Sequence, residues 1–204
     1  APHHGFLDPV VVTEPRLKAL PTGHPRVDLL VGYLGVPFSS SSRNAMELLA
    51  DILGGGIRSR LFLELREKRK MAYLVHAYPV TYGLGGYLAI RVNCDLSELP
   101  KVYAAIQQQL EYVKEDGICS SELTRAKAAR TTAILRVLEN SSQHLQLLGR
   151  HSVLNDEFFV DLETRRVEAV QTEDIVRVAR DILVPDNLAV VALGPKEENL
   201  LQLV

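Results

Sequence analysis

The sequence predicts an α+β fold in which a mostly antiparallel sheet is covered by helices on one face. Three observations point to this class. Short segments typical of strands, either alternating or continuously apolar, occur near the start, in the middle and near the end of the chain. The two middle segments are separated by a glycine-containing turn, which is typical of an antiparallel hairpin. The stretches between these segments carry apolar residues at helical spacing, so helices are expected to cover the sheet.

The chain is expected to divide into an arm and one domain. The prolines in residues 1–25 predict an extended arm or the remnant of a linker, with one short strand at Val10–Val12. Residues 26–204 are then expected to form a single domain. Its first element is a mostly buried strand over residues 26–36, which Pro37 ends.

The glycines Gly54, Gly55 and Gly56 separate two predicted helices. Four serines, Ser39–Ser42, offer N-caps for the first helix over residues 43–53, which the glycines end. Three consecutive glycines indicate a backbone geometry that other residues adopt poorly. The second helix is expected to begin at Ser59 or its neighbours and to end in a basic cluster before Tyr73, which opens the next strand.

The rest of the chain is predicted to form a hairpin, four helices and a last strand. The hairpin strands cover residues 73–78 and 87–94. The remaining elements follow in this order: a helix that Ser97 caps and Gly117 ends, one long helix from Ser120 or Ser121 through Leu148, a helix over residues 156–170, a helix from Thr172 to Pro185, and a buried strand over residues 188–193.

Composition and charge exclude several classes of function. The formal net charge is −2 and the isoelectric point is near 6.3, so there is no electrostatic case for binding nucleic acid. No apolar run approaches the roughly 20 residues that span a bilayer, and no leader typical of a signal peptide opens the chain. Cys94 and Cys119 have no CxxC neighbour, and nothing in the sequence supports a disulfide between them. A soluble protein is expected, and its compartment stays open.

The sequence contains no self-sufficient active site. None of the histidine patterns typical of zinc ligands, HxxxH, HxxEH or HExxH, occurs. His144 and His151 lie two helical turns apart, so they are expected to be partly buried helix residues rather than ligands. The serine elbow GxSxG and the phosphate-binding pattern GxxxxGK(S/T) are also absent. No metal site and no cofactor are therefore predicted in this chain.

Arg66 and Tyr73 remain as candidates for chemistry. A guanidinium is a fixed, charged fork that suits carboxylates and peptide carbonyls, and a tyrosine hydroxyl can donate to a developing oxyanion. The alternative is that Arg66 belongs to a solvated charged helix end, residues 66–70, and that Tyr73 simply packs. Composition alone favours this alternative, because runs of charge at helix ends are usually solvated.

One motif resembles a known family, the M16 zinc metallopeptidases, which include pitrilysin, insulin-degrading enzyme and mitochondrial processing peptidase. The family pattern LGGG, SRLF, E, REK and AY is matched here by Leu53–Gly56, Ser59–Phe62, Glu64, Arg66–Lys68 and Ala72–Tyr73. The resemblance is to the second, non-zinc homologous domain and covers roughly residues 25–195. Lys70 and Met71 depart from it, since Gly-Leu is common there.

The resemblance implies a role for Arg66 and Tyr73. In such peptidases the first domain holds zinc through HxxEH and a distal Glu, and the second contributes an Arg and a Tyr at the spacing found here. By resemblance, Arg66 holds a substrate carbonyl, and Tyr73 helps to stabilise the tetrahedral oxyanion. The neighbouring Gly54–Gly56, Ser59 and Arg60 are expected to position the loop and the helix.

The resemblance also implies a partner and a substrate class. The helix that would carry HxxEH corresponds to residues 43–53, which contain no histidine, so zinc is expected only in an N-terminal M16 domain or a paired subunit. With that partner, the chain is expected to be the substrate-binding half of a bacterial zinc endopeptidase of the cytoplasm or periplasm, acting on peptides and inactive alone. The alternative is a non-catalytic structural or scaffold subunit of the same ancestry.

Overall fold

A five-stranded sheet forms the centre of the computed structural model, which describes residues 16–154, 156 and 158–195. The strand order across the sheet is β1-β5-β2-β4-β3. The strands are β1 (Arg16–Pro21), β2 (Arg26–Gly35), β3 (Ala72–Thr81), β4 (Gly86–Asp95) and β5 (Leu188–Gly194). Strand β2 runs antiparallel to both β4 and β5, and β3 and β4 form the predicted hairpin. Only β1 and β5 pair in parallel, so the predicted α+β class with a mostly antiparallel sheet is confirmed.

Strand β1 lies within the segment that was expected to be an extended arm. It extends the sheet beyond β5, with Arg16 opposite Ala189 and Pro21 opposite Gly194. The sheet therefore begins before residue 26. The sequence near β1 gave no sign of this, because its partner strand β5 lies near the other end of the chain. The expected strand at Val10–Val12 lies outside the described residues.

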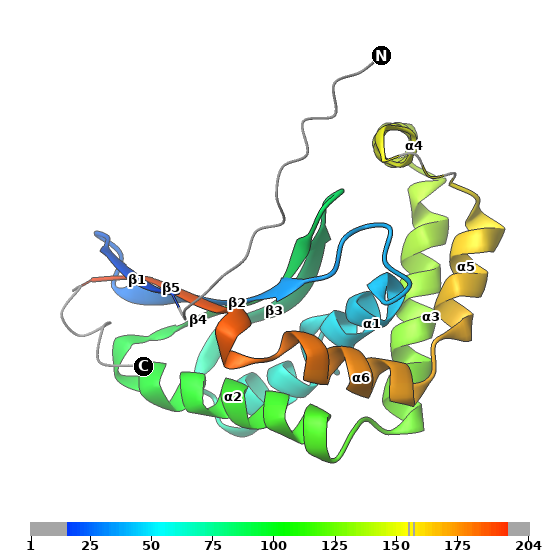
Figure 1. The fold of residues 1–204 in the computed structure, drawn as a ribbon. Helices are drawn as coiled ribbons and strands as arrows, with labels where there is room; N and C mark the ends of the chain where they lie inside the picture. Colours follow the sequence, from blue (N-terminus) through cyan, green and yellow to red (C-terminus); the bar gives the residue numbers. More distant parts are fainter. Residues whose placement is uncertain (1–15, 155, 157, 196–204) are drawn as a thin grey trace.

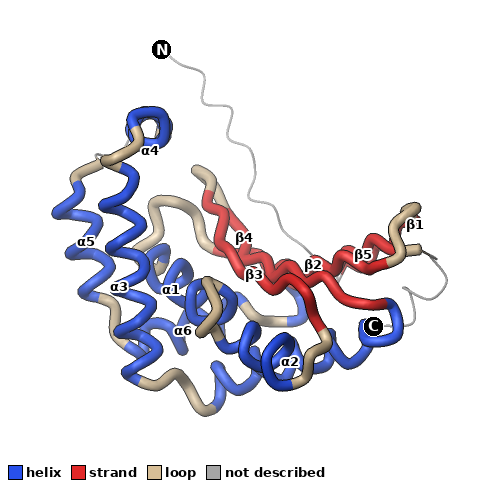
Figure 2. Tube along the Cα trace, turned by 180° about the vertical axis from the view of Figure 1, so that it is seen from behind, coloured by secondary structure: helices blue, strands red, loops and turns tan. Residues whose placement is uncertain are grey.

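The helices gather on one face of the sheet (Figure 1). They are α1 (Arg43–Gly54), the π-helix η1 (Phe62–Lys68), the 3-10 turn η2 (Leu96–Glu98), α2 (Leu99–Glu115), α3 (Ser120–Val137), α4 (Ser141–Val153), α5 (Val160–Ala169), α6 (Thr172–Ile182) and the 3-10 turn η3 (Pro185–Asn187). Figure 2 shows, from behind, α1, α2 and α6 beneath the sheet and the pair α3 and α5 beyond its edge. Helix α4 lies across the end of that pair.

Alternation along β2 places the core between the sheet and the helices. Val27, Leu29, Val31 and Tyr33 point to the helix side and are buried, as predicted. Helix α1 packs against β3, and its apolar stripe is buried in the same core. Each fully buried Leu or Ile in this layer contributes about 1.5–3 kcal/mol through the removal of apolar surface from water.

The predicted long helix is wrong, because two helices occupy its place. Helix α3 ends at Val137 and α4 begins at Ser141. Asn140 lies between them in an extended conformation, and its side-chain oxygen accepts a hydrogen bond from Gln143 N at 3.1 Å, which is a regular N-cap. Arg150 then fastens α4 to the hairpin by donating to the carbonyl oxygen and the hydroxyl of Thr81.

Several helix boundaries also differ from those predicted. Helix α5 begins at Val160 rather than at residue 156, and Ser97 lies inside the turn η2 rather than capping α2. Gly117 follows α2 with φ +78°, as the predicted helix stop requires. None of the helices in the described residues is long and apolar enough to cross a membrane. Both cysteines are free thiols, Cys94 buried and Cys119 exposed.

Candidate functional site

The glycine stretch brings the end of α1 against the sheet. Gly54 is the last residue of α1, and a Cβ added there would lie 2.7 Å from Ala77 Cβ on β3 and closer still to the Ala77 backbone nitrogen. Only glycine permits this approach of helix to strand. The second helix begins next to Ser59, as expected, because the Leu63 N–H donates to the Ser59 carbonyl at 3.0 Å, and the Ser59 hydroxyl donates to the Gly56 carbonyl at 2.6 Å within the preceding turn.

Arg60 joins this turn to the start of α3. Its Nε and Nη2 donate to the two Glu122 carboxylate oxygens at 2.6 and 2.8 Å, and Nη2 also donates to the Gly117 carbonyl at 2.9 Å. Glu122 in turn accepts from the Cys119 backbone N–H, which makes it part of the α3 capping box. Burial by itself would raise the pKa of Glu122, but the hydrogen bonds from Arg60 and Cys119 outweigh it and lower that pKa to about 2. Arg60 thus positions η1 against α3.

Arg66 lies on the π-helix η1, whose widened turns are frequent at functional sites. Its guanidinium carbon lies 5.1 Å from the centre of the Phe62 ring, which is a cation–π arrangement. The helix closes with the Met71 N–H donating to the Leu65 carbonyl at 2.8 Å. Between them, Lys70 adopts φ +54°, the left-handed region that favours glycine.

Arg66 and Tyr73 are in direct contact. Arg66 Nη1 donates to the Tyr73 carbonyl oxygen at 2.9 Å. The β3–β4 register shifts between Ala72 and Leu74, so Tyr73 is the extra residue of a β-bulge. The bulge places Tyr73 and Leu74 in succession on exposed positions, and the Tyr73 side chain is 47% exposed. The predicted pair therefore lies together at the edge strand of the sheet.

Two further residues complete this cluster and were not found from the sequence. The Tyr73 hydroxyl donates to Asp95 Oδ2 at 3.1 Å, and the Arg26 guanidinium carbon lies 3.6 Å from the centre of the Tyr73 ring. Arg26 and Asp95 are opposite one another in the β2–β4 register and form an ion pair at 3.8 Å. Their pairing depends on the register of two distant strands, so local spacing gives no signal for it.

The cluster offers hydrogen-bond donors to a ligand but no nucleophile. Arg66 and Arg26 both contact Tyr73, Arg66 at its carbonyl oxygen and Arg26 at its ring, and their guanidinium N–H groups can donate hydrogen bonds to carbonyl or carboxylate ligands. Within the described residues, no three His, Cys, Asp or Glu side chains gather where they could hold a metal ion. Helix α1 contains no histidine, so a zinc ion has no donor set there.

The two helix histidines occupy structural positions apart from this cluster. His151 is 3% exposed, its Nδ1 lies 3.0 Å from Asp156 Oδ2, and its ring meets Phe38 and Phe158 edge-on. Burial lowers the pKa of His151, against the opposing effect of nearby carboxylates. His144 also contacts Phe158 edge-on. His144 is partly buried, as predicted, whereas His151 is buried more completely than predicted.

Comparison with known proteins gives a consistent family match. The model of the peptidase M16 inactive domain matches residues 1–130, more than half of the chain. The uncharacterized zinc protease SCO5738 of Streptomyces coelicolor is 30% identical over 156 residues, 76% of this chain and 34% of that protein. The chain thus spans about a third of that relative's length.

Solved structures share the fold at low sequence identity. A protease from Helicobacter pylori superimposes with a TM-score of 0.84 at 21% identity, over 91% of this chain and 45% of that one. A chain of complex III2 from Candida albicans superimposes with a TM-score of 0.79 at 13% identity, over 94% of this chain and 49% of that one. Identities this low show the fold alone.

Proposed function

Because the chain belongs to the M16 peptidase family, as an M16 inactive domain, we propose that it is the substrate-binding half of a zinc-dependent endopeptidase. A partner domain or subunit that carries HxxEH would hold the zinc ion and cleave the peptide. The chain would act in a bacterial cytoplasm or periplasm. By itself, it would bind no catalytic zinc and cleave nothing.

The direct contact between Arg66 and Tyr73 carries this proposal. The hydrogen bond of 2.9 Å joins the guanidinium to the backbone of the bulge residue, and both side chains belong to exposed residues. Arg66 would use its remaining N–H groups to hold a substrate carbonyl. Tyr73 would donate its hydroxyl proton in a hydrogen bond to the tetrahedral oxyanion. For this, the hydroxyl must exchange Asp95 for the substrate.

Kinetics of a Tyr73→Phe variant in the full-length protein test this role. Loss of one oxyanion donor is expected to lower kcat about 10²-fold while KM changes little. The free energy of unfolding should change by less than about 1 kcal/mol, because the lost hydrogen bond is exposed. Tyr82→Phe is the matched control, since Tyr82 is exposed just beyond the opposite end of β3. Wild-type turnover by Tyr73→Phe would refute the assignment.

A second candidate is a non-catalytic scaffold subunit. It is favoured by the contacts within the cluster, which already occupy the groups that a substrate would need. In this protein the Tyr73 hydroxyl is already bound to Asp95, and Arg26 covers the ring. These contacts join β2, β3 and β4, so the cluster could also serve only to stabilise the sheet. Mixing the chain with the zinc-bearing domain distinguishes the two: peptide cleavage that requires both components supports the first candidate, and a stable complex without cleavage supports the second.

A further inference from the structure

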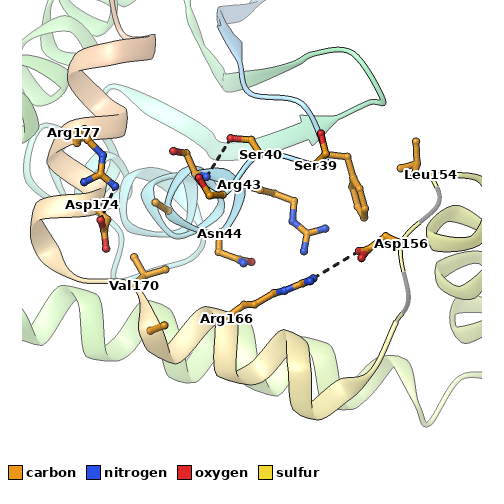
Figure 3. A pocket seen from close by; sticks show the side chains of 15 residues that line it. Ser39, Ser40, Arg43, Asn44, Leu154, Asp156, Arg166, Val170, Asp174 and Arg177 are labelled. Carbon is orange, nitrogen blue, oxygen red and sulfur yellow. Dashed lines mark hydrogen bonds and ion pairs between the residues drawn. The ribbon is translucent and has the colours of Figure 1, made fainter.

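A cavity of about 610 Å³ lies at the start of α1, away from the Arg66–Tyr73 cluster. Ser39–Ser42 and the first turn of α1 line the cavity together with Ala169, and Figure 3 shows Arg166 and Val170 across from Ser39 and Ser40. The serines were expected to be caps, and the proposed peptidase role does not use them. We call this space the α1 cavity, and its lining contains both polar and apolar side chains.

Backbone N–H groups in the first turn of α1 receive no hydrogen-bond acceptor from the N-cap side chain. The first intrahelical bond runs from Met46 N–H to the Ser42 carbonyl, so the N–H groups of Asn44 and Ala45 precede it. Ser42 occupies the N-cap position but makes no side-chain capping bond. Uncapped N–H groups at the positive end of a twelve-residue helix attract a negatively charged group.

Asn44 provides an independent sign of a missing ligand. It is only 8% exposed, and its Oδ1 has no hydrogen-bond partner in the described structure. Figure 3 shows its side chain pointing from α1 toward Arg166, across the lining of the cavity. A buried amide oxygen without a donor costs free energy, so this position is suited to a ligand that brings an N–H group.

The arginines that line the cavity are all paired with carboxylates, so they leave little free positive charge for a ligand with more than one negative charge. Arg166 already binds Glu163 and approaches Asp156 at 3.6 Å, and Arg177 binds Asp174. The two lining carboxylates would repel a doubly charged phosphate. The apolar part of the lining consists of Phe38 and four aliphatic side chains, so it can receive an aliphatic group.

We propose that the α1 cavity binds the C-terminal residue of a peptide. The terminal carboxylate accepts hydrogen bonds from the N–H groups of Asn44 and Ala45. The last peptide N–H donates to Asn44 Oδ1, which otherwise lacks a partner. The aliphatic wall at Ala169 and Val170 receives the last side chain. This site goes beyond the proposed role of Arg66 and Tyr73 and does not depend on it.

Titration of the chain with short acetylated peptides tests the proposal. The probes are acetyl-alanyl dipeptides ending in Ala, Val, Leu or Phe, each as the free acid and as the C-terminal amide, with inorganic phosphate as a third arm. Amide chemical shifts of Asn44 and Ala45 report carboxylate binding at the helix start. At least one free acid is expected to bind one to one and to shift both signals, with its amide form at least tenfold weaker.

An Asn44→Ala variant separates binding from folding. It is expected to weaken free-acid binding about tenfold through loss of one hydrogen bond, with an unchanged or higher Tm because an unsatisfied buried oxygen is removed. Arg136→Gln, on the exposed part of α3, should bind as wild type does. The proposal would be overturned if no free acid bound, if acid and amide bound equally, or if phosphate alone bound. It would also be overturned if Asn44→Ala kept full affinity or had a lower Tm.

Discussion

The Tyr73 hydroxyl donates a hydrogen bond of 3.1 Å to Asp95 Oδ2, and this bond ties the bulge of β3 to the end of β4. Tyr73 has no partner residue in the β3–β4 ladder, so this side-chain bond adds a link between the two strands at the bulge. The Arg26 guanidinium carbon lies over the face of the same ring, 3.6 Å from its centre. The hydroxyl therefore has a defined resting position from which a substrate would have to displace it.

A double-mutant cycle between Tyr73→Phe and Asp95→Ala measures this bond. We expect a coupling free energy of about 0.5–1 kcal/mol, because the bond has a charged acceptor but is exposed to water. Urea unfolding of the wild type, both single variants and the double variant supplies the four values. Additive effects of the two substitutions would mean that Asp95 does not hold the hydroxyl in solution.

The pair Arg66 and Tyr73 could be predicted because its signal is local. The family motif singles out both residues as candidates, and the structure brings them into contact, while their role in binding stays a prediction. Arg26 and Asp95 could not be found in this way, because the register of β2 on β4 brings them together. The same reason explains why β1 was missed. This short strand is stabilised by pairing with β5, which is distant in the sequence, so its own residues gave no clear strand pattern.

The helices show a similar division between local and distant signals. Apolar spacing predicted α1, α2 and α6 well because each has one continuous buried stripe. The spacing continued through the break between α3 and α4, and only Asn140, an N-cap residue, marked it. The π-helical turn of η1 has no counterpart in apolar spacing, so its widened geometry could not be predicted.

Gly54→Ala tests the close approach of α1 to β3. The added methyl group would overlap the Ala77 backbone and Cβ, so we expect a loss of about 2 kcal/mol or more in the free energy of unfolding. Gly85→Ala is the control, because a Cβ at Gly85 meets no atom within 4 Å. Denaturant unfolding of both variants gives the comparison. An equal, small effect at both positions would contradict the packing described for α1.

Lys70→Gly should stabilise the protein. Lys70 has φ +54°, where a Cβ is unfavourable, and the family resemblance places glycine at this position. We expect a gain of about 0.5–1 kcal/mol after the greater backbone entropy of unfolded glycine is subtracted. Lys68→Gly, within the helical backbone of η1, is expected to lose about 1 kcal/mol instead. Thermal unfolding measures both, and a lower Tm for Lys70→Gly would contradict the left-handed assignment.

The Glu122–Arg60 pair should make stability depend on pH in the acid range. The pKa of Glu122 is lowered to about 2 in the folded protein from its usual value of 4.5, so the folded state binds fewer protons than the unfolded state between these values. Its contribution is therefore complete above about pH 5 and is lost as the pH falls toward 2. We expect about 1–2 kcal/mol, below the full linkage value because water partly reaches the pair.

Urea unfolding at a series of pH values from 6 to 2 measures this loss in the wild type and in Glu122→Gln. The variant removes the titrating group, so its stability should fall less steeply than that of the wild type over this range. Arg60→Gln keeps the carboxylate but removes its strongest donor, and it should flatten the dependence in the same way. Parallel curves for all three proteins would show that this ion pair, which joins η1 to α3, does not form in solution.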